Sequence, residues 1–371
     1  MKIAIVHDYL NQYGGAERVI EVLHEVFPEA PIYTSVYLPD NLPESFKQMD
    51  IRTTFMQGFP FIDKLYKKYL MFYPFAIRSL NVKKYDLIIS SSSSFAKGVK
   101  KGKNALHVCY CYTPTRFIWY YDFYVRKERF NKIISFLLPL FIRFLKRWDL
   151  KVIQGIDKFI AISENIQEKI KTCYRRDSVV IYPPVDLSKF NISDENNENK
   201  GDYFLIVSRL NSYKSLDLAV KAINKLSLNL KIIGAGPYRQ ELERMAKGNE
   251  KIEFLGKVSD EELKRYYKGC RALIFPGEED FGISPLEAQA SGRPVIAFAK
   301  GGALETIITG ETGLFFEEGN ENSLEEAINY FIKIENNFKS SKIRAHALKF
   351  DKEIFKTSFK KYIDDLTINN I

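Results

Sequence analysis

Short apolar runs alternate along this chain with longer stretches in which apolar residues recur at helical spacing. The runs with the length and composition of buried strands are residues 2–6, 87–89, 106–109, 159–162, 203–207, 230–233, 252–255, 272–275 and 294–298. Helical stretches such as 261–267 and 286–290 fall between them. Runs that are apolar on both faces and separated by helices are typical of parallel sheets covered on both sides. The pattern therefore predicts a chain of the α/β class with doubly wound domains, whose ligands bind at the carboxyl ends of the strands.

A polar stretch divides this pattern in two. Residues 191–202 (NISDENNENKGD) contain one apolar residue in twelve, which is typical of an exposed linker. At roughly 150 residues per domain, the 371 residues are enough for about two to three domains. We predict one Rossmann-like domain over residues 1–185 and a second over 200–349, with a ligand site in the cleft between them.

The composition narrows the class of protein further. With 46% hydrophobic and 27% charged residues, the chain is expected to form well-packed cores. Its 4 cysteines are too few for a disulfide scaffold and fit a reducing compartment. The opening apolar run is too short for the hydrophobic region of a signal peptide, so we expect a cytoplasmic protein.

The charge balance favours a polyanionic partner. The net charge is +9, which suits a nucleic acid, an anionic membrane face or a phosphorylated substrate. A basic nucleic-acid-binding protein is one alternative, but no motif that reads DNA or RNA is present and the charge is spread along the chain. We therefore expect no nucleic-acid partner.

Two aromatic or apolar segments with basic neighbours bear on membrane binding. No stretch reaches the roughly 18 apolar residues that a spanning helix needs. Residues 133–145 (IISFLLPLFIRFL), which have basic flanks, form either an interfacial membrane helix or a buried helix of the first domain. Residues 66–75 (YKKYLMFYPF) either face lipid or cover a core. We expect peripheral attachment to the inner face of the cell membrane.

The segment 275–298 carries the most informative carboxylates. Glu279 and Glu287 stand eight positions apart, between a predicted strand and a helix. Ser284 and Glu287 have the spacing of a capping box, in which Ser284 is the N-cap and Glu287 bonds back to it. A glutamate in that first turn can also leave one oxygen for a ribose hydroxyl, and Gly282 allows the backbone to approach a ligand closely. The two interpretations are compatible.

Basic and glycine-rich turns follow other predicted strands. Arg209 and Lys214 flank a short turn before a helix that we expect to begin near Ser215; they either neutralise a diphosphate or are solvated cations. Gly14 and Gly15 precede a predicted helix and either expose its N–H groups to a phosphate or permit a tight turn. Residues 234–237 (GAGP) lack the third glycine of a dinucleotide fingerprint, and no GxxxxGK[ST] loop is present.

The sequence does not favour a metal site. The 4 histidines are scattered, and Cys109 and Cys111 have no second pair within zinc-binding spacing, so they are more consistent with core strand positions. The chain also contains no Asp-x-Asp that would hold a divalent ion against a diphosphate.

Taken in order, these motifs resemble glycosyltransferase family 4, retaining nucleotide-sugar transferases of the GT-B architecture with two facing Rossmann-like domains. The matching segments are 14–18 (GGAER), 86–90 (DLIIS), 182–186 (YPPVD), 208–210 (SRL) with Lys214, 234–237, 254–256 (FLG) with Ser259 and Asp260, and 279–287 as an E-x7-E element. Residues 7–10 (HDYL) and 109–116 (CYCYTPTR) further resemble a subgroup of O-antigen-type mannosyltransferases.

The resemblance implies a site and a reaction. Arg209 and Lys214 would bind the donor diphosphate and stabilise its departure, and Glu279 would hold hydroxyls of the transferred sugar. The implied donor-binding positions are Gly14, Gly15, Gly234, Gly256, Lys257, Val258, Phe281, Gly282, Ile283 and Glu287, with Glu287 on the ribose. The resemblance implies no metal and no other cofactor. The substrates would be a nucleotide sugar, with GDP-mannose favoured, and a saccharide or lipid-linked acceptor in cell-surface polysaccharide synthesis. A sugar-nucleotide epimerase of similar fold is the alternative enzyme.

Two further features follow from the resemblance. Related sequences often carry a histidine where this chain has Tyr112, so no histidine role is assigned there; His107 is expected to be a core residue with its hydrogen bonds satisfied. Family members commonly return their last helix to the first domain, and residues 350–371 would do the same.

Overall fold

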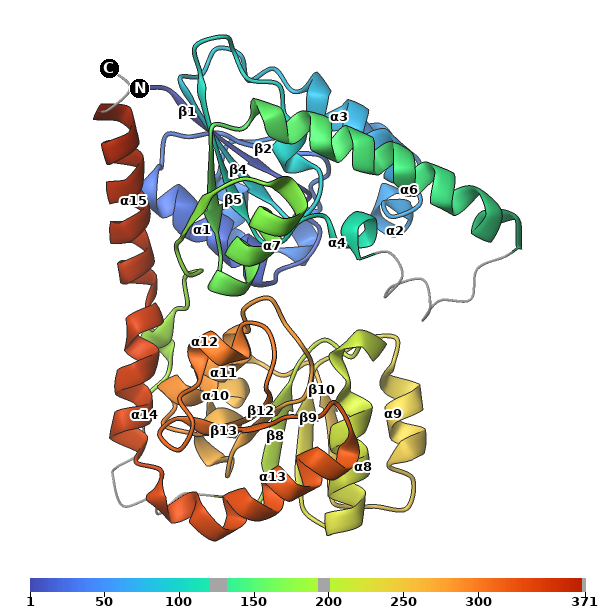
Figure 1. The fold of residues 1–371 in the computed structure, drawn as a ribbon, viewed down its shortest axis with the longest axis vertical. Coiled ribbons are helices and arrows are strands. Elements are labelled where there is room, and N and C mark those ends of the chain that lie inside the picture. The colour runs from blue at the N-terminus through green and yellow to red at the C-terminus, as the bar shows by residue number, and fades with distance from the viewer. Residues whose placement is uncertain (121–131, 193–200, 369–371) are drawn as a thin grey trace. The chain divides into compact units, whose positions relative to one another are not determined.

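The computed structural model describes residues 1–120, 132–192 and 201–368, and only the backbone of residues 132–137 (Figure 1). The chain divides into two compact units. Unit 1 comprises Met1–Pro184 and Phe355–Ile371, and unit 2 comprises Val185–Ile354. Each unit is described by itself.

Unit 1 is built on a parallel sheet in the order β3-β2-β1-β4-β5-β6-β7. Its strands are β1 Ile3–His7, β2 Ile32–Thr34, β3 Ile51–Thr53, β4 Leu87–Ser92, β5 Leu106–Cys111, β6 Lys158–Ala161 and β7 Ser178–Val180. The central strand β4 is buried along its whole length, as expected for a strand covered on both faces. The predicted runs 2–6, 87–89, 106–109 and 159–162 are thus confirmed as strands.

Helices cover both faces of the unit 1 sheet (Figure 1). On one face, Tyr110 of β5 contacts the rings of Phe355 and Phe359 in α15 Lys352–Ile368, and Phe359 also contacts Phe27, which ends α1 Gly15–Val26. On the other face, the core includes side chains from α2 Ile62–Leu65, α3 Tyr73–Ser79 and α6 Lys132–Val152. The short helix α4 Arg116–Trp119 follows β5, and α7 Glu164–Tyr174 packs against β6 and β7.

Unit 2 repeats the plan in the order β10-β9-β8-β11-β12-β13. The strands are β8 Phe204–Val207, β9 Leu230–Ile233, β10 Ile252–Gly256, β11 Leu273–Phe275, β12 Val295–Phe298 and β13 Gly313–Phe316. One core joins the sheet to α8 Leu216–Leu226, α9 Arg239–Met245 and α13 Glu321–Ile334. The helices α10 Asp260–Gly269, α11 Ile283–Ala290, α12 Ala303–Thr306 and α14 Ser340–Ala347 form a second group around α11. The prediction of a doubly wound α/β chain is confirmed.

Short strands account for the elements that the hydrophobic pattern did not predict. β2, β3, β7 and β13 have three or four residues each, and β3, β7 and β13 lie at sheet edges. The edge strands β3 and β7 are only partly buried, so their residues do not form the continuous apolar run of a central strand. The predicted linker at 191–202 lies largely outside the described residues.

The segment 133–145 is helical, because it lies within α6. The side chains of its first residues lie outside the described part; of the others, Leu145 is fully buried whereas Leu140 and Phe144 are exposed. Within the described residues, no helix is long and apolar enough to cross a membrane.

Candidate functional site

The strand order of unit 2 reverses between β8 and β11, which are neighbours in the sheet but are separated in the chain by β9 and β10. In open parallel sheets, the loops that leave such a pair diverge and leave a crevice at the carboxyl ends of the strands. The loop after β8 carries Arg209 and Lys214, and the loop after β11 carries Glu279. The three candidate catalytic residues therefore lie on the two loops that leave the switch point of unit 2.

Lys214 and Glu279 are in direct contact there. The Lys214 ammonium donates a hydrogen bond to Oε1 of Glu279 and forms an ion pair with it. Lys214 is buried and Glu279 is half-buried, so water only partly screens this pair. Together with Ser208 and Gly277, the two side chains line a small hollow at the ends of β8 and β11.

Glycines of neighbouring loops hold the Lys214 loop in place. A Cβ added to Gly234 would lie 1.9 Å from the carbonyl oxygen of Ser208, and one added to Gly277 would lie 2.7 Å from that of Lys214. Gly234 also has φ +134°, a region that side chains rarely adopt. These positions therefore require glycine so that the loops can pack against each other, which assigns Gly234 a structural role that the motif alone did not reveal.

Arg209 differs from Lys214 in its surroundings. Its side chain is exposed and makes no hydrogen bond or ion pair with the residues that the structure describes. A guanidinium in this position can bind an incoming anion without first breaking an internal contact.

The loop from Glu279 into α11 corrects one prediction. The helix begins at Ile283 with Gly282, at φ +95°, as its N-cap. The Ser284 hydroxyl does not cap the helix but donates to the carbonyl of Val207, at the end of β8. The capping-box interpretation of Ser284 and Glu287 is therefore wrong: a tertiary bond to the neighbouring strand outcompetes the local one.

Glu287 is instead held by another helix. Its side chain is buried, and Oε2 accepts a 2.7 Å hydrogen bond from the hydroxyl of Tyr267 in α10. Ahead of it, Phe281 is buried against Phe350, and the backbone of residues 279–281 lies against Gly301 and Gly302. This packing fixes the backbone that connects Glu279 to the first turn of α11.

Gly256, Lys257 and Val258 lie after β10. Gly256 has φ +71°, and its carbonyl accepts a hydrogen bond from the backbone N–H of Gly234. Lys257 is exposed and Val258 is half-buried. The ends of β8, β9 and β10 are thus joined through glycines, so Gly234 and residues 256–258 lie at the carboxyl ends of neighbouring strands.

The switch point of unit 1 lies between β1 and β4, and Gly14 and Gly15 lie in the loop that follows β1. The Gly14 N–H donates to Oε2 of Glu17, 2.9 Å away, and Oε1 of Glu17 lies 3.9 Å from Nε2 of His7. A carboxylate of the chain thus already accepts one of the N–H groups at this helix start. The sequence interpretation missed Glu17, although its place in the first helical turn is a signal for this role.

Tyr112 joins the same region. Its hydroxyl donates to the carbonyl of Ala16 at 3.1 Å and lies 2.7 Å from the hydroxyl of Ser91. Burial raises the pKa of Tyr112 well above its ordinary value, so the phenol stays neutral and serves as a hydrogen-bonding group. His107 is buried with Nε2 2.8 Å from the Ser90 hydroxyl, which confirms it as a satisfied core residue; Cys109 and Cys111 are buried in β5, as predicted.

Asp8 is a second carboxylate that the sequence did not single out. Its two oxygens accept four backbone N–H bonds, at 2.6–2.9 Å, from residues 93–96, and a further bond from the Ser93 hydroxyl. Asp8 therefore ties the loop after β4 to the end of β1. Among the described residues, no group of three or more His, Cys, Asp or Glu side chains is placed to hold a metal ion.

Comparison with known families agrees with this architecture. Residues 13–189 match the model of Glycosyltransferase Family 4, and residues 188–348 match that of Glycosyl transferases group 1. The chain belongs to glycosyltransferase family 4. It has the GT-B fold, in which two Rossmann-like domains follow each other along the chain.

Similar proteins include named mannosyltransferases. The chain is 35% identical over 174 residues to the O-antigen chain mannosyltransferase RfbU of Salmonella typhimurium, which covers 44% of this chain and 47% of RfbU. It is 25% identical over 376 residues to the Alpha-1,3/1,6-mannosyltransferase ALG2 of Dictyostelium discoideum, covering 84% and 85% of the two chains. The chain spans about half the length of three of the curated relatives it matches, RfbU among them.

Among solved structures, Anabaena Alr3699/HepE in complex with UDP-glucose has a TM-score of 0.74 at 16% identity, covering 98% of this chain and 100% of that one. At this identity the likeness shows the fold alone.

Proposed function

We propose that this chain is a retaining hexosyltransferase that moves a hexose from a nucleotide diphosphate sugar to a saccharide or lipid-linked saccharide acceptor in cell-surface polysaccharide synthesis. The observation that carries the proposal is the contact between Lys214 and Glu279 at the switch point of unit 2, with the exposed Arg209 on the same loop. Cations at a switch point suit the diphosphate of such a donor, and a carboxylate suits the hydroxyls of its sugar.

The charges match the demands of the reaction. Breaking the anomeric C–O bond leaves negative charge on the diphosphate and oxocarbenium character on the sugar. Arg209 and Lys214 stabilise the first, and Glu279 favours the second. Because Glu279 already holds Lys214, the ammonium is positioned before the donor binds, and little reorganisation is needed when charge develops.

Retention follows if the leaving group also serves as the base. In this proposal the acceptor oxygen attacks the face from which the diphosphate departs. The new C–O bond forms as the old one breaks, and the acceptor proton passes to the departing phosphate oxygen. No protein nucleophile is needed, so the protein contributes positioning and electrostatics.

The remaining candidates surround the donor. Glu287 presents its carboxylate to the ribose while Tyr267 holds one of its oxygens. The backbone of residues 281–283 lines the sugar and phosphate pocket, and residues 256–258 lie beside the base. In unit 1, Gly15 supplies its backbone N–H, and Gly14 allows the backbone to approach the donor closely while its own N–H stays bonded to Glu17.

GDP-mannose is the donor we favour. The names of RfbU and ALG2 support a mannosyl group, whereas the HepE complex contains UDP-glucose, so the base needs a direct test. Thermal stabilisation by a panel of GDP-, UDP- and ADP-sugars provides it, because a ligand bound to the native state raises the midpoint of unfolding. Stabilisation by GDP-mannose at the lowest concentration supports the assignment, and preference for a UDP-sugar contradicts it.

The proposal includes two statements about the surroundings of the site. The reaction needs no metal, because Arg209 and Lys214 supply the positive charge and the sequence has no Asp-x-Asp. The protein works as a cytoplasmic enzyme attached peripherally to the inner face of the cell membrane, where a lipid-linked acceptor would be found; the basic net charge supports this location.

Substitution of the two cations tests the reaction. We expect Arg209→Ala and Lys214→Ala to lower kcat by about 10²–10³ each, as loss of a charge-stabilising donor does, and to change donor affinity much less. Lys333→Ala, at an exposed lysine of α13, is the matched control. Wild-type kcat in either variant would show that its cation has no role in the chemical step.

A further inference from the structure

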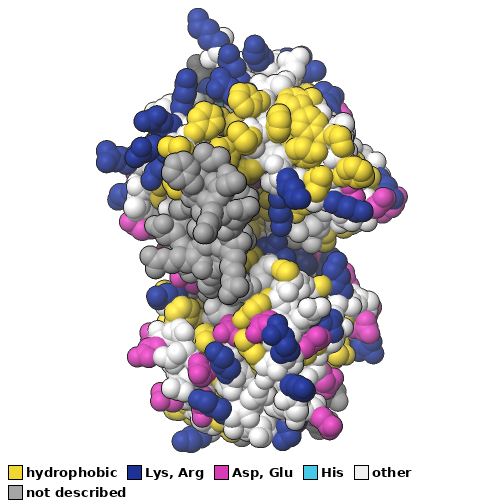
Figure 2. Space-filling view, turned by 90° about the vertical axis from the view of Figure 1, so that its right-hand side faces the viewer, with side chains coloured by type: hydrophobic (Ala, Val, Ile, Leu, Met, Phe, Trp, Pro, Cys, Tyr) yellow, Lys and Arg dark blue, Asp and Glu magenta, His cyan; other side chains and the backbone are white. Residues whose placement is uncertain are grey.

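One surface of unit 1 exposes several large hydrophobic side chains from a single stretch of the sequence. Between β3 and β4, side chains of η3 Phe55–Gly58, the turn before α2, η4 Leu70–Phe72 and α3 reach the surface. The exposed large hydrophobic residues of this region, which we call the aromatic face, are Phe55, Phe61, Met71, Phe72 and Phe75. Figure 2 shows hydrophobic side chains gathered on this side of unit 1, with Lys and Arg side chains beside them. Contiguous apolar surface of this kind marks an interaction site.

The aromatic face is an ordered platform. The Phe59 ring contacts the rings of Phe55, Tyr69 and Phe72 at centroid distances of 4.9–5.8 Å. Below them, Tyr73 stacks on the buried Phe95 of the unit 1 core. The exposed rings are therefore held in place from beneath.

Phe61 is the most exposed of these residues and has an unfavourable backbone. Its side chain is 71% exposed, and its φ of +50° lies in the left-handed region, which disfavours a bulky residue. The next residue, Ile62, is buried in the core and begins α2, so the turn that lifts Phe61 outward is anchored on one side. Neither the strain nor the exposure benefits the isolated domain, whereas both are compensated if the ring enters an apolar medium.

The charge around the aromatic face indicates which apolar medium its rings would enter. Residues 55–84 contain six lysine and arginine residues and one acidic residue, in a chain whose net charge is +9. Lys64, Lys67 and Lys68 are exposed and form no ion pair with the residues that the structure describes. Lysine is depleted in protein–protein interfaces, whereas lysines beside exposed aromatic rings are typical of surfaces that bind anionic lipid.

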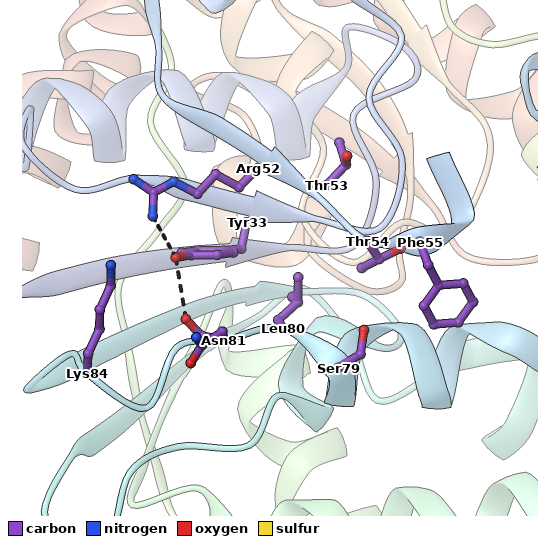
Figure 3. A pocket seen from close by; sticks show the side chains of 9 residues that line it. All are labelled: Tyr33, Arg52, Thr53, Thr54, Phe55, Ser79, Leu80, Asn81 and Lys84. Atoms are coloured by element: carbon purple, nitrogen blue, oxygen red, sulfur yellow. Dashed lines mark hydrogen bonds between the residues drawn. The ribbon is translucent and has the colours of Figure 1, made fainter. Parts of the chain in front are cut away.

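A hollow adjoins the aromatic face at Phe55. It has a volume of about 580 Å³ and lies between the β2–β3 edge and residues 79–84. Figure 3 shows Arg52 and Lys84 at one end of it and Phe55, a member of the aromatic face, at the other. The Arg52 guanidinium is held by the Asp50 carboxylate and the Tyr33 hydroxyl, so it is fixed in position. The hollow offers a lipid headgroup a basic recess beside an apolar surface.

We infer that the aromatic face is the surface by which this chain docks on a bilayer that contains anionic phospholipid. Phe61 enters the boundary between headgroups and acyl chains, with Phe72 and Phe75 beside it. Lys64, Lys67 and Lys68 lie at the level of the lipid phosphates. The inference rests on the proposed membrane attachment and names the surface, the lipid chemistry and the inserted residue.

Vesicle sedimentation with the full chain tests the surface. We expect binding to vesicles of phosphatidylglycerol and phosphatidylcholine that weakens with salt, and much weaker binding to phosphatidylcholine alone. Phe61→Ser should lower the partition coefficient about tenfold, since it removes one inserted aromatic side chain. Phe61→Ser/Phe72→Ser/Phe75→Ser should abolish binding. Tyr330→Ser, at an exposed aromatic position of α13, is the matched control.

A second set of variants isolates the charge. Lys64→Gln/Lys67→Gln/Lys68→Gln should lower binding to the anionic vesicles about a hundredfold, at roughly 1 kcal/mol per lysine. Lys333→Gln/Lys339→Gln/Lys342→Gln, in an exposed region of unit 2, is the control of equal charge. Phe61→Trp should show a blue-shifted emission on anionic vesicles and quenching by brominated lipid, a direct readout of insertion that does not depend on a loss of function.

Any of three results would overturn the inference. The first is a wild-type chain that does not bind the anionic vesicles, and the second is a Phe61→Ser/Phe72→Ser/Phe75→Ser variant that binds them like wild type. The third is a dimer in solution that Phe61→Ser converts to a monomer, because the aromatic face would then bind a second copy of the chain. Nucleotide-sugar stabilisation is measured on the same variants. It should be unchanged, which shows that they are folded, and its absence from all variants and wild type alike would count against the proposed reaction but not against the docking surface.

Discussion

Replacing Lys97 by methionine removes the positive member of a completely buried ion pair in unit 1. Lys97 lies in η5 Ala96–Gly98, and its ammonium lies 3.1 Å from Oδ1 of Asp149 in α6; both side chains are 0% exposed. The ammonium also donates to the Ser94 carbonyl at 2.7 Å and to the Thr115 hydroxyl at 2.6 Å. Burial lowers the pKa of Lys97 and the charge of Asp149 raises it; the pKa is raised on balance, so the lysine stays charged at neutral pH.

The cost of the substitution follows from what remains. In Lys97→Met the Asp149 carboxylate keeps hydrogen bonds from Trp119, at 2.7 Å, Tyr174, at 2.8 Å, and the Thr115 hydroxyl, at 3.3 Å, but loses its counter-ion. Breaking a buried pair from one side costs about 3–5 kcal/mol, and the three remaining donors favour the lower end. A loss of about 3 kcal/mol is a large part of the 5–15 kcal/mol that stabilises a typical domain.

Urea unfolding followed by tryptophan fluorescence measures this cost, because both tryptophans of the chain, Trp119 and Trp148, belong to unit 1. Asp149→Asn should destabilise by a similar amount, whereas the double variant should cost at least about 2 kcal/mol less than the sum, since it leaves no unpaired charge. Lys101→Met, which breaks a partly exposed pair with Asp157, should cost about 1 kcal/mol or less. A cost for Lys97→Met no greater than that of Lys101→Met, or additive single costs, would refute this reasoning.

Three further predictions concern acid stability, backbone packing and metal dependence. Burial lowers the pKa of His107 from 6.5 to about 4. Below pH 6.5 the unfolded chain therefore takes up a proton at His107 that the native chain does not. The free energy of unfolding should fall by up to about 3 kcal/mol between pH 6.5 and 4. Denaturant midpoints across this range should be visibly less pH-dependent in His107→Gln, and an unchanged slope would exclude His107 as the cause. Gly234→Ala should lower the free energy of unfolding by about 2–4 kcal/mol, because the added Cβ collides with Ser208. Gly58→Ala is the control: the space around Gly58 is open, so the change should be less than about 1 kcal/mol. Equal thermal midpoints for the two variants would contradict the packing argument. EDTA should leave the transferase rate unchanged, and a loss that Mg²⁺ or Mn²⁺ restores would show that the reaction needs a metal.

The hydrophobic pattern identified the strands that lie inside the two sheets, such as β1, β4 and β8, because a strand covered on both faces must be apolar at successive positions. It did not identify β2 or β7, each of which has only three residues and therefore leaves too short a pattern. The hydrophobic pattern also could not predict the order of the strands in each sheet, because that order depends on how the connections between strands pack in three dimensions. That order makes β8 and β11 neighbours, and it brings Lys214 to Glu279 across 65 positions of sequence.

Local spacing was least reliable where a tertiary bond competed with it. Ser284 and Glu287 have the spacing of a capping box. In the structure, however, the Ser284 hydroxyl donates to the Val207 carbonyl, and the Glu287 carboxylate accepts a hydrogen bond from Tyr267. The basic and aromatic character of residues 66–75 was legible in the sequence, but the left-handed turn at Phe61, which presents that ring outward, was not.

The sequence by itself therefore determined the class of fold, the family, and which residue types follow each strand, because burial on both faces and glycine at tight turns leave marks in the local order of residues. Only the tertiary structure decided which of those residues meet. Contacts such as Lys97 with Asp149 and Lys214 with Glu279 join distant segments, and their energy depends on burial and distance, which no local pattern encodes.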